Sequence, residues 1–547
     1  MSTRISAAGA ARRFFVTLTL SIAVLVFPAQ NLFAANCSVV KHNPPTEADK
    51  AFLAADFAKA ESLYKADVAA HPGDADAISG LVRTLLREQK VLDAEEAVHA
   101  ALDAAPKAAN GSPNSAPLLT LLGEVKFRQG EPLEVEPIVI QSYKLDPCNP
   151  RTRLLFARYS EINSRFATAR QQIGFAHQFD PDDPEIRAAW IQTLPMTQRI
   201  AEMEAYLSAP SGNDPETVHK MQANLALWKK QAVEPVRACR LVSTAAPVDL
   251  PFLRLGVSGG DLLTLQRVRA FGVRVELNNA PASLQLGAGD GGLAVYRSLA
   301  EHAGLKRLTE SHPGGPFGKP IYLAYADSIK VGSLEFKDCT VKVIDSNSPP
   351  MQDDTDGLIG MDVFSDYLVT IDYPMRKVKL GPLPARPAEG SAPAPSLRTT
   401  SPDDAGVAQD AVYDRFVAPE MKDYTQFFRV GDNVILPALI NGSKLKLFIL
   451  DLGASESNIS AGVAMDVTKV HERPGPGPKT FEADEITYNF AHMSQKVTNV
   501  ATANTSAISA SLGLDISGNI GANTFQLLTM HIDYRDGLIK FDYVPGH

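Results

Sequence analysis

The arrangement of hydrophobic and polar residues changes twice along the chain. From residue 45 to residue 235 the sequence is rich in alanine, and apolar residues recur three and four positions apart, as in amphipathic helices. In residues 245–382, and again in residues 426–547, apolar and polar residues alternate in short runs that predict strands. Residues 383–425 between them are rich in Pro, Ala and Ser and predict a semi-extended linker. The pattern therefore predicts a helical region followed by two β-rich lobes.

Prolines near Gly, Asp or Asn recur in the helical region at intervals of 34, 41 and 34 residues, and they are Pro72, Pro106, Pro147 and Pro181. The longer interval contains a polar insertion that begins at Asn110. Thirty-four residues is the period of tetratricopeptide helical pairs, and the segment resembles such an array. The resemblance implies stacked pairs, a capping helix near residues 215–230 and a concave surface that docks a protein partner. A nonrepetitive helical bundle is the alternative.

Residues 1–35 have the layout of a secretory signal. A basic stretch with Arg4, Arg12 and Arg13 precedes an apolar run over residues 14–27 and the small residues at 34 and 35. This layout predicts cleavage and export, to the periplasm or outside the cell. The alternative is an uncleaved membrane anchor, although the run is shorter than the ~20 residues that a spanning helix needs.

The net charge and the cysteine pattern argue against some classes of partner and cofactor. The net charge of -9 argues against a nucleic-acid partner, and loss of the basic leader would make the remainder more negative still. Export permits disulfides, but the wide spacing of the cysteines indicates no disulfide framework and leaves their pairing open; these are Cys37, Cys148, Cys239 and Cys339. No Cys-x-x-Cys or His-Glu-x-x-His spacing occurs, so the sequence predicts neither metal nor cofactor.

The two β-rich lobes repeat one set of motifs. In the second lobe, Phe-Ile-Leu-Asp-Leu-Gly-Ala-Ser (448–455) is an apolar strand that enters a glycine turn, and Asn-Ile-Gly (519–521) follows about 70 residues later. In the first lobe, Leu-Gln-Leu (284–286) enters Gly-Ala-Gly-Asp (287–290), and Gly-Leu-Ile-Gly (357–360) follows. Each lobe also has an Asn hairpin before the turn and an Ile-Asp-Tyr hairpin at its end. We interpret the two lobes as a duplication.

These motifs resemble those of retropepsin-like aspartic peptidases, especially bacterial tandem versions, over residues 260 to 545. The resemblance implies that Asp451 is a catalytic residue. The active-site turn would comprise Leu452, Gly453, Ala454 and Ser455. Leu452 stands where the family usually has Thr or Ser. The supporting apolar-Gly motifs would be Gly357, Leu358, Ile359 and Gly360 in the first lobe, and Ile520 and Gly521 in the second.

Aspartic peptidases need two neighbouring carboxylates that share one proton, and the first lobe departs from that pattern. In an ungapped register Gly287 takes the aspartate position, Gly289 keeps the motif glycine, and Asp290 comes three residues late. An alternative register reads Asp290 itself as the start of an Asp-x-Gly turn. We favour the ungapped register because a slipped strand must invert its faces or bulge.

Three interpretations follow for activity. Asp451 of a second chain completes the pair in a homodimer, Asp290 acts as an imperfect partner, or the protein is noncatalytic and binds peptides. The sequence thus predicts an exported aspartic-type endopeptidase acting on peptide or protein substrates, with a noncatalytic peptide-binding scaffold as the alternative.

Other motifs carry less chemistry. Residues 287–292 satisfy the Gly-x-Gly-x-x-Gly dinucleotide fingerprint and precede a predicted helix at 293–302, but no alternating strand-helix series surrounds them. Ser455 lacks the second glycine of a nucleophile elbow. His531, and the repeated Asp372 and Asp533, are predicted to be structural.

Overall fold

The computed structural model describes residues 37–105, 107, 114–233, 239–244, 247–256, 270–287, 292–310, 321–344, 354–386, 414–454, 456–473 and 479–543. The predicted leader and most of the predicted linker lie outside these residues. Within them, no helix combines the length and the apolar character needed to span a membrane.

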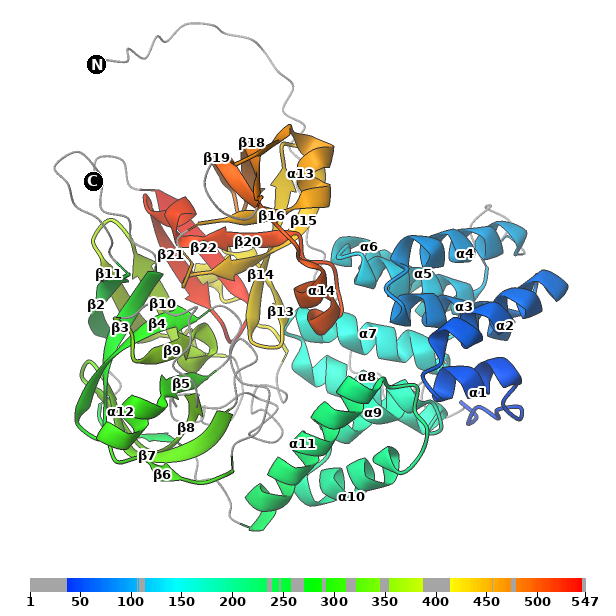
Figure 1. Ribbon diagram of the computed structural model, residues 1–547, viewed down its shortest axis with the longest axis horizontal. Helices are drawn as coiled ribbons and strands as arrows, with labels where there is room; N and C mark the ends of the chain where they lie inside the picture. The colour runs from blue at the N-terminus through cyan, green and yellow to red at the C-terminus, as the bar shows by residue number, and fades with distance from the viewer. Residues whose placement is uncertain are drawn as a thin grey trace, which may run out of the picture. The chain divides into compact units, whose positions relative to one another are not determined.

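The helical region consists of successive antiparallel helices (Figure 1). They are α1 (Glu47–Leu53), α2 (Phe57–Ala70), α3 (Ala75–Arg87), α4 (Val91–Ala104), α5 (Ala116–Arg128), α6 (Pro132–Leu145), α7 (Pro150–Ile162), α8 (Phe166–Phe179), α9 (Pro184–Gln192), α10 (Met196–Leu207) and α11 (Pro215–Val233). The second helix of each predicted repeat ends two residues before its marker proline, because the residue preceding a proline disfavours the helical conformation.

Small residues allow close helix contacts within this tetratricopeptide-like array. A Cβ atom at Gly80 in α3 would lie 2.2 Å from the ring of Tyr64 in α2. The last helix, α11, packs the buried Trp228 against Met203 and Tyr206 of α10. It covers the end of the array, as the sequence predicted for a helix in this place.

Lobe 1 contains β1 (Arg240–Leu241), β2 (Val248–Leu255), β3 (Ala270–Leu277), β4 (Ala280–Gly287), β5 (Leu293–Tyr296), α12 (Arg297–His302), β6 (Lys306–Arg307), β7 (Ile321–Val331), β8 (Leu334–Ile344), β9 (Gly357–Gly360), the 3-10 turn η3 (Met361–Phe364), β10 (Tyr367–Asp372) and β11 (Lys377–Pro382). Its first strand therefore lies before residue 245. The expected helix at 293–302 is wrong for its first four residues: Leu293–Tyr296 pair with both β8 and β9, and their apolar side chains are buried there.

Lobe 2 repeats this order. It contains η5 (Pro419–Met421), β12 (Thr425–Gln426), β13 (Phe428–Val430), β14 (Asn433–Ile440), β15 (Lys444–Asp451), β16 (Asn458–Ser460), α13 (Ala461–Val467), β17 (Val470–Glu472), β18 (Phe481–Phe490), β19 (Met493–Ala503), α14 (Ser506–Leu512), β20 (Gly518–Gly521), η6 (Ala522–Phe525), β21 (Leu528–Asp533) and β22 (Leu538–Tyr543). In both lobes an Asn in the left-handed region, Asn278 or Asn441, turns the hairpin that leads to the glycine turn, as the sequence predicts.

One sheet joins the two lobes. β10 of lobe 1 pairs antiparallel with β21 of lobe 2, with Thr370 opposite His531. His531 bonds Thr370 through Nδ1 (3.0 Å) and Asp542 through Nε2 (3.1 Å), which agrees with a structural role. The hydrophobic core is continuous across this junction. A single chain therefore holds its two lobes together.

The helical array packs on lobe 2. Apolar residues of α6 and α7, including Val139 and Leu155, form one buried cluster with Leu447 and Ile449 of β15. The N–H of Asp515 donates to the carbonyl oxygen of Arg128 at 2.9 Å. The array thus contacts the same strand that ends at Asp451.

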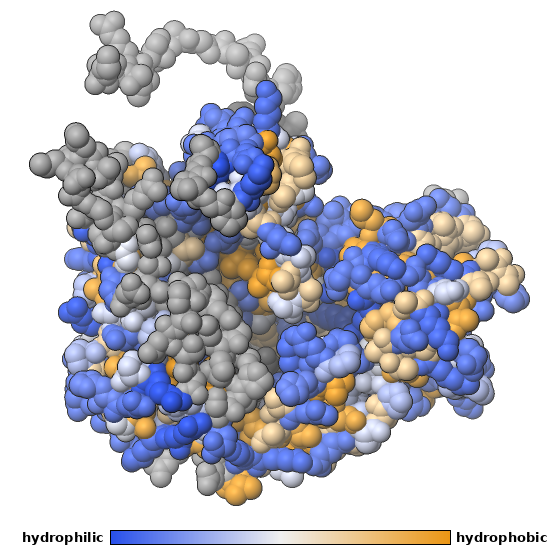
Figure 2. All heavy atoms as spheres, viewed as in Figure 1, coloured by the Kyte–Doolittle hydropathy of each residue, from blue (hydrophilic) through white to orange (hydrophobic). Residues whose placement is uncertain are grey.

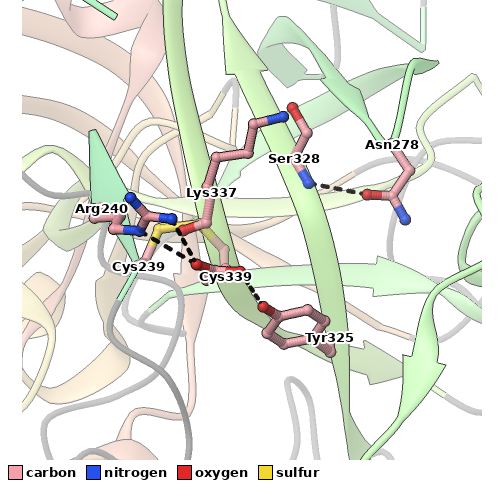
Figure 3. The surroundings of a disulfide bond; sticks show 8 residues. Cys239, Arg240, Asn278, Tyr325, Ser328, Lys337 and Cys339 are labelled. Atoms are coloured by element: carbon pink, nitrogen blue, oxygen red, sulfur yellow. Dashed lines mark hydrogen bonds and ion pairs between the residues drawn. A yellow bond between two sulfur atoms is a disulfide. The ribbon is translucent and has the colours of Figure 1, made fainter. Parts of the chain in front are cut away.

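A disulfide fastens the first strand of lobe 1 (Figure 3). Cys239 precedes β1 and is bonded to Cys339 on β8, and the guanidinium of Arg240 donates to Asp338 at 3.2 Å. Tyr325 donates to the other oxygen of Asp338. Cys37 and Cys148 are also disulfide-bonded. The pairing of Cys239 with Cys339, which the sequence left open, is thus settled by the structure.

Candidate functional site

Asp451 lies at the end of β15, where the strand enters a tight turn. Its Oδ1 accepts hydrogen bonds from the backbone N–H groups of Gly453 (3.0 Å) and Ala454 (2.9 Å). Its Oδ2 accepts one from Nδ2 of Asn519 (3.1 Å). Parallel pairing of β15 with β20 brings Asn519 there, because Asp451 stands opposite Gly521 and Ile449 opposite Asn519. The carboxylate is therefore fixed on both oxygens.

Burial dominates the electrostatics of this carboxyl group. Burial raises the pKa of Asp451, and the hydrogen bonds from Ala454, Asn519 and Gly453 lower it only in part, so the pKa is raised overall. The carboxyl group therefore retains a proton to higher pH than a solvated aspartate does. A group of this kind is suited to exchanging a proton with a ligand.

The segments behind the turn hold it in place. The N–H of Gly521 donates to Oγ of Ser457 at 2.9 Å, and that hydroxyl also bonds Thr524 at 2.9 Å. The N–H of Ala522 donates to the carbonyl oxygen of Ala454 at 2.8 Å. Leu452, where the family usually has a hydroxyl residue, is buried in the core. Apolar packing thus replaces a side-chain hydrogen bond at that position.

Lobe 1 presents glycine at the equivalent position. In the parallel pair β4–β9, Gly287 stands opposite Gly360, just as Asp451 stands opposite Gly521 in lobe 2. The neighbouring pairs, Leu286 with Ile359 and Leu450 with Ile520, correspond as well. A Cβ atom at Gly287 would have its nearest neighbour at 3.7 Å. Among the described residues, no atom crowds a Cβ atom at this position.

The turn of lobe 2 packs directly on the strand of lobe 1. A Cβ atom at Gly453 would lie 2.2 Å from the carbonyl oxygen of Leu286 and 3.1 Å from Nε2 of Gln285. Only glycine permits an approach this close. The end of β4 in lobe 1 is therefore in contact with the Asp451 turn within one chain.

Lobe 1 fastens its own turn differently. The N–H of Gly292 donates to both carboxylate oxygens of the fully buried Asp362, at 2.9 and 2.8 Å. The N–H of Gly360 donates to the carbonyl oxygen of Gly292 at 2.9 Å. The buried carboxylate of lobe 1 thus supports the backbone and does not occupy the position equivalent to Asp451.

Sequence reasoning did not assign roles to three residues around Asp451. Asn519 was visible only as a polar residue within an apolar-Gly motif. Gln285 and Tyr373 come from lobe 1, and both are buried. Within the described part of the chain, Gln285 Oε1 and the Tyr373 hydroxyl have no hydrogen-bond partner. Burial raises the pKa of Tyr373, and the negative charge of Asp451 raises it further.

The remaining candidate residues divide into two groups. Gly357 and Gly360 lie on β9, and Ile520 and Gly521 on β20, each in the strand that pairs with the turn-bearing strand. Gly289, Asp290 and Ser455 lie outside the described residues. Among the residues that are described, no cluster of three or more His, Cys, Asp or Glu side chains could hold a metal ion.

Residues 273–363 match the family model for aspartyl protease. Lobe 1 is an aspartyl protease-like domain. The match begins in β3 and ends in η3, so it includes Gly287 and excludes Asp451. The recognised domain and the intact carboxylate therefore belong to different lobes.

Similarity to individual proteins is partial. Over 188 residues the chain is 27% identical to the cellulose synthase operon protein C of Pseudomonas fluorescens (strain SBW25), an alignment that covers 33% of this chain and only 14% of the relative. A thermophilic tetratricopeptide protein of Thermus thermophilus is 16% identical, with 33% of this chain and 95% of that chain covered and a TM-score of 0.26. A retropepsin-like aspartic protease of Rickettsia conorii is 16% identical, with 26% and 94% covered and a TM-score of 0.18.

Proposed function

We propose that the protein binds peptide segments between its two aspartyl protease-like lobes without hydrolysing them, while the helical array docks a protein partner. The register of Gly287 carries this proposal. One carboxylate of an aspartic peptidase activates water while the other, protonated, donates to the peptide carbonyl oxygen. Among the residues that the structure describes, lobe 1 has Gly287 at the position that corresponds to Asp451, so it places no second carboxylate there.

The arrangement of the lobes disfavours a homodimeric peptidase. A second Asp451 would have to approach the turn from the side where the Leu286 carbonyl oxygen already lies against Gly453. The β10–β21 pairing holds that contact in place. A dimer built around two Asp451 residues would require both interactions to break.

Polar groups near Asp451 support binding of an amide-containing ligand. The Tyr373 hydroxyl and Gln285 Oε1 are buried and lack hydrogen-bond partners in the described residues. Buried polar groups in native proteins are almost always satisfied by protein, solvent or ligand. Together with the Asp451 carboxyl group, they would offer donors and acceptors to a peptide backbone.

Hydrolysis by Asp451 is the second candidate. The fixed carboxyl group and its raised pKa favour it, because such a group is suited to general acid–base chemistry. A comparison of wild type with Asp451→Asn decides between the two. Each protein is incubated with a fluorogenic unfolded protein from acidic to neutral pH, and binding of a labelled peptide library is measured in parallel. We expect peptide binding without turnover, and cleavage by wild type that disappears in Asp451→Asn would overturn the proposal.

We further propose that the protein is exported. The layout of residues 1–35 and the Cys239–Cys339 disulfide both support this, because disulfides persist in oxidising compartments. Fractionation of cells with an antibody against the helical array tests it. Recovery of the full-length chain from the cytoplasm, with free thiols, would contradict export.

A further inference from the structure

Arginines gather on alternate helices of the array around one partly buried carboxylate. Glu185, at the start of α9, accepts from Arg87 of α3 (3.0 Å) through Oε1. Its Oε2 accepts from Arg151 (3.1 Å) and Arg158 (3.3 Å) of α7. Both oxygens of Glu185 are therefore committed to guanidinium groups.

Arg128, at the end of α5, joins this group without a carboxylate of its own. Its Nη2 donates to the amide oxygen of Gln89 at 2.8 Å, and no ion pair joins it to an acidic residue within the described part of the chain. Burial lowers the pKa of Arg128, and the neighbouring charges of Arg158 and Arg87 lower it further. Glu185, which Arg87 and Arg158 share with Arg151, offsets this effect only in part at Arg128.

This arginine group is accessible from solvent and lies beside lobe 2. The side chains of Arg158 and Arg87 are 40% and 28% exposed. Nη1 of Arg128 is 3.4 Å from the position that a Cβ atom at Gly513 would occupy, directly after α14. The surface of the array in view is mainly hydrophilic (Figure 2). A ligand at this group would therefore meet charge on the array and the end of α14 on lobe 2.

We propose that Arg87, Arg128 and Arg158 bind an acidic peptide segment through its side-chain carboxylates. Guanidinium groups match carboxylates, which they can bind through two parallel hydrogen bonds, and Arg128 has only the neutral amide of Gln89 as its hydrogen-bond partner. A nucleic acid carries a charge on every nucleotide, so the rest of this chain, with its net charge of -9, would repel it more strongly than a short acidic segment. The site is separate from the peptide site proposed between the lobes, and it stands if that proposal fails.

Fluorescence anisotropy on the full chain tests the site. The probe is a labelled peptide that alternates Glu with Gly and Ser, and its matched control has Gln in place of every Glu. We expect Arg128→Gln to weaken binding of the acidic probe about tenfold or more, since a charge-assisted hydrogen bond is lost. Binding should also weaken with added salt. Arg274→Gln, at an exposed arginine on β3, is the control and should bind like wild type.

Further variants separate this site from folding effects and from the site between the lobes. If Arg128→Gln unfolds the array, Arg158→Gln provides the test, because that side chain is more exposed. Loss of acidic-probe binding in Arg128→Gln, without a matching loss for the Gln control peptide, distinguishes this site from the site between the lobes. Equal binding of the Glu and Gln probes would overturn the proposal, as would tighter binding of a single-stranded oligonucleotide or wild-type affinity in both folded arginine variants.

Discussion

The two β lobes share one fold and differ in chemistry. Lobe 1 contains the segment that matches the aspartyl protease family, yet it has Gly287 at the position that corresponds to Asp451. Lobe 2 lies outside that match, yet it carries Asp451 on a complete cradle of hydrogen bonds. A family match over one lobe therefore indicates a shared order of strands and shared glycine positions. Catalytic activity has to be judged from the side chains that meet between the lobes.

The repeated Ile-Asp-Tyr hairpins show the same divergence. Asp372 of lobe 1 is partly exposed and accepts from the N–H of Met375 at 2.8 Å. Asp533 of lobe 2 is fully buried and accepts from the N–H of Asp536 at 3.0 Å. Both are structural, as the sequence predicts. They differ in their surroundings, because a second buried carboxylate, Asp536, stands beside Asp533 alone.

Introducing a carboxylate at the Gly287 position of lobe 1 is expected to have the largest effect, because it removes the main chemical difference between the lobes. Gly287→Asp should produce proteolysis of an unfolded substrate at acidic pH, on the order of 10³-fold above wild type, because an acid–base group contributes that much to proton transfer. A Cβ atom at Gly287 would make only ordinary van der Waals contacts with the described residues, at 3.7 Å or more.

Two controls accompany this variant. Gly287→Asn has the same shape without the acid and should remain inactive. Addition of Asp451→Asn to Gly287→Asp should abolish the gain. A folded Gly287→Asp protein with wild-type turnover would show that Gly287 does not face Asp451 in a productive geometry.

The contrast between Asp533 and Asp372 predicts a pH dependence of stability. Burial and the charge of Asp536 raise the pKa of Asp533 from 3.8 to about 7. The folded state then binds the proton more tightly than the unfolded state, so stability should fall as the pH rises from about 4 to about 7. Asp533→Asn should remove this loss and stabilise the protein at neutral pH by on the order of 3 kcal/mol.

Urea denaturation across this pH range measures the effect. Asp372→Asn is the matched control in lobe 1 and should keep the wild-type pH profile. If the free energy of unfolding falls with rising pH equally in wild type and in Asp533→Asn, the pH dependence comes from other groups.

The contact between the lobes can be tested with a pair of alanine substitutions. Gly453→Ala should destabilise the protein by about 2 kcal/mol, because the new methyl group would overlap the Leu286 carbonyl oxygen. Gly287→Ala adds the same methyl group at the equivalent turn of lobe 1, where the nearest atom is 3.7 Å away, and should cost less than about 1 kcal/mol. If Gly453→Ala and Gly287→Ala have equal free energies of unfolding, the lobes are not packed against each other at Gly453.

Local patterns predicted much of this fold. The marker prolines located the ends of α2, α4, α6 and α8, and the Asn hairpins located the strands that lead to each glycine turn. These features depend on backbone preferences of a few adjacent residues, which a single sequence displays directly. The strand Leu293–Tyr296 was missed because its conformation depends on pairing with β8 and β9, which lie far away in the sequence.

The site was only partly predictable for the same reason. Asp451 and its glycine turn are contiguous in sequence, so their chemistry could be recognised. The contact of Gly453 with Leu286, and the proximity of Tyr373, depend on how two lobes come together. The Cys239–Cys339 disulfide, which joins residues 100 positions apart, likewise left no local signal.

The smallest expected effect concerns Asn519, whose counterpart in lobe 1 is Leu358. Asn519 pairs with Ile449 in lobe 2, and Leu358 pairs with Gln285 at the corresponding place in lobe 1. Asn519→Leu removes the hydrogen bond to Oδ2 and should raise the pKa of Asp451 further, because the charged form loses a donor worth on the order of 1.5 kcal/mol. Carboxyl-carbon NMR titration of labelled aspartates, assigned with Asp451→Asn, measures the shift. Asn523→Ala, at an exposed neighbour, should leave it unchanged. If the pKa stays at its wild-type value in Asn519→Leu, then burial and the backbone alone control the proton on Asp451, and lobe 2 needs no residue that lobe 1 lacks apart from the aspartate itself.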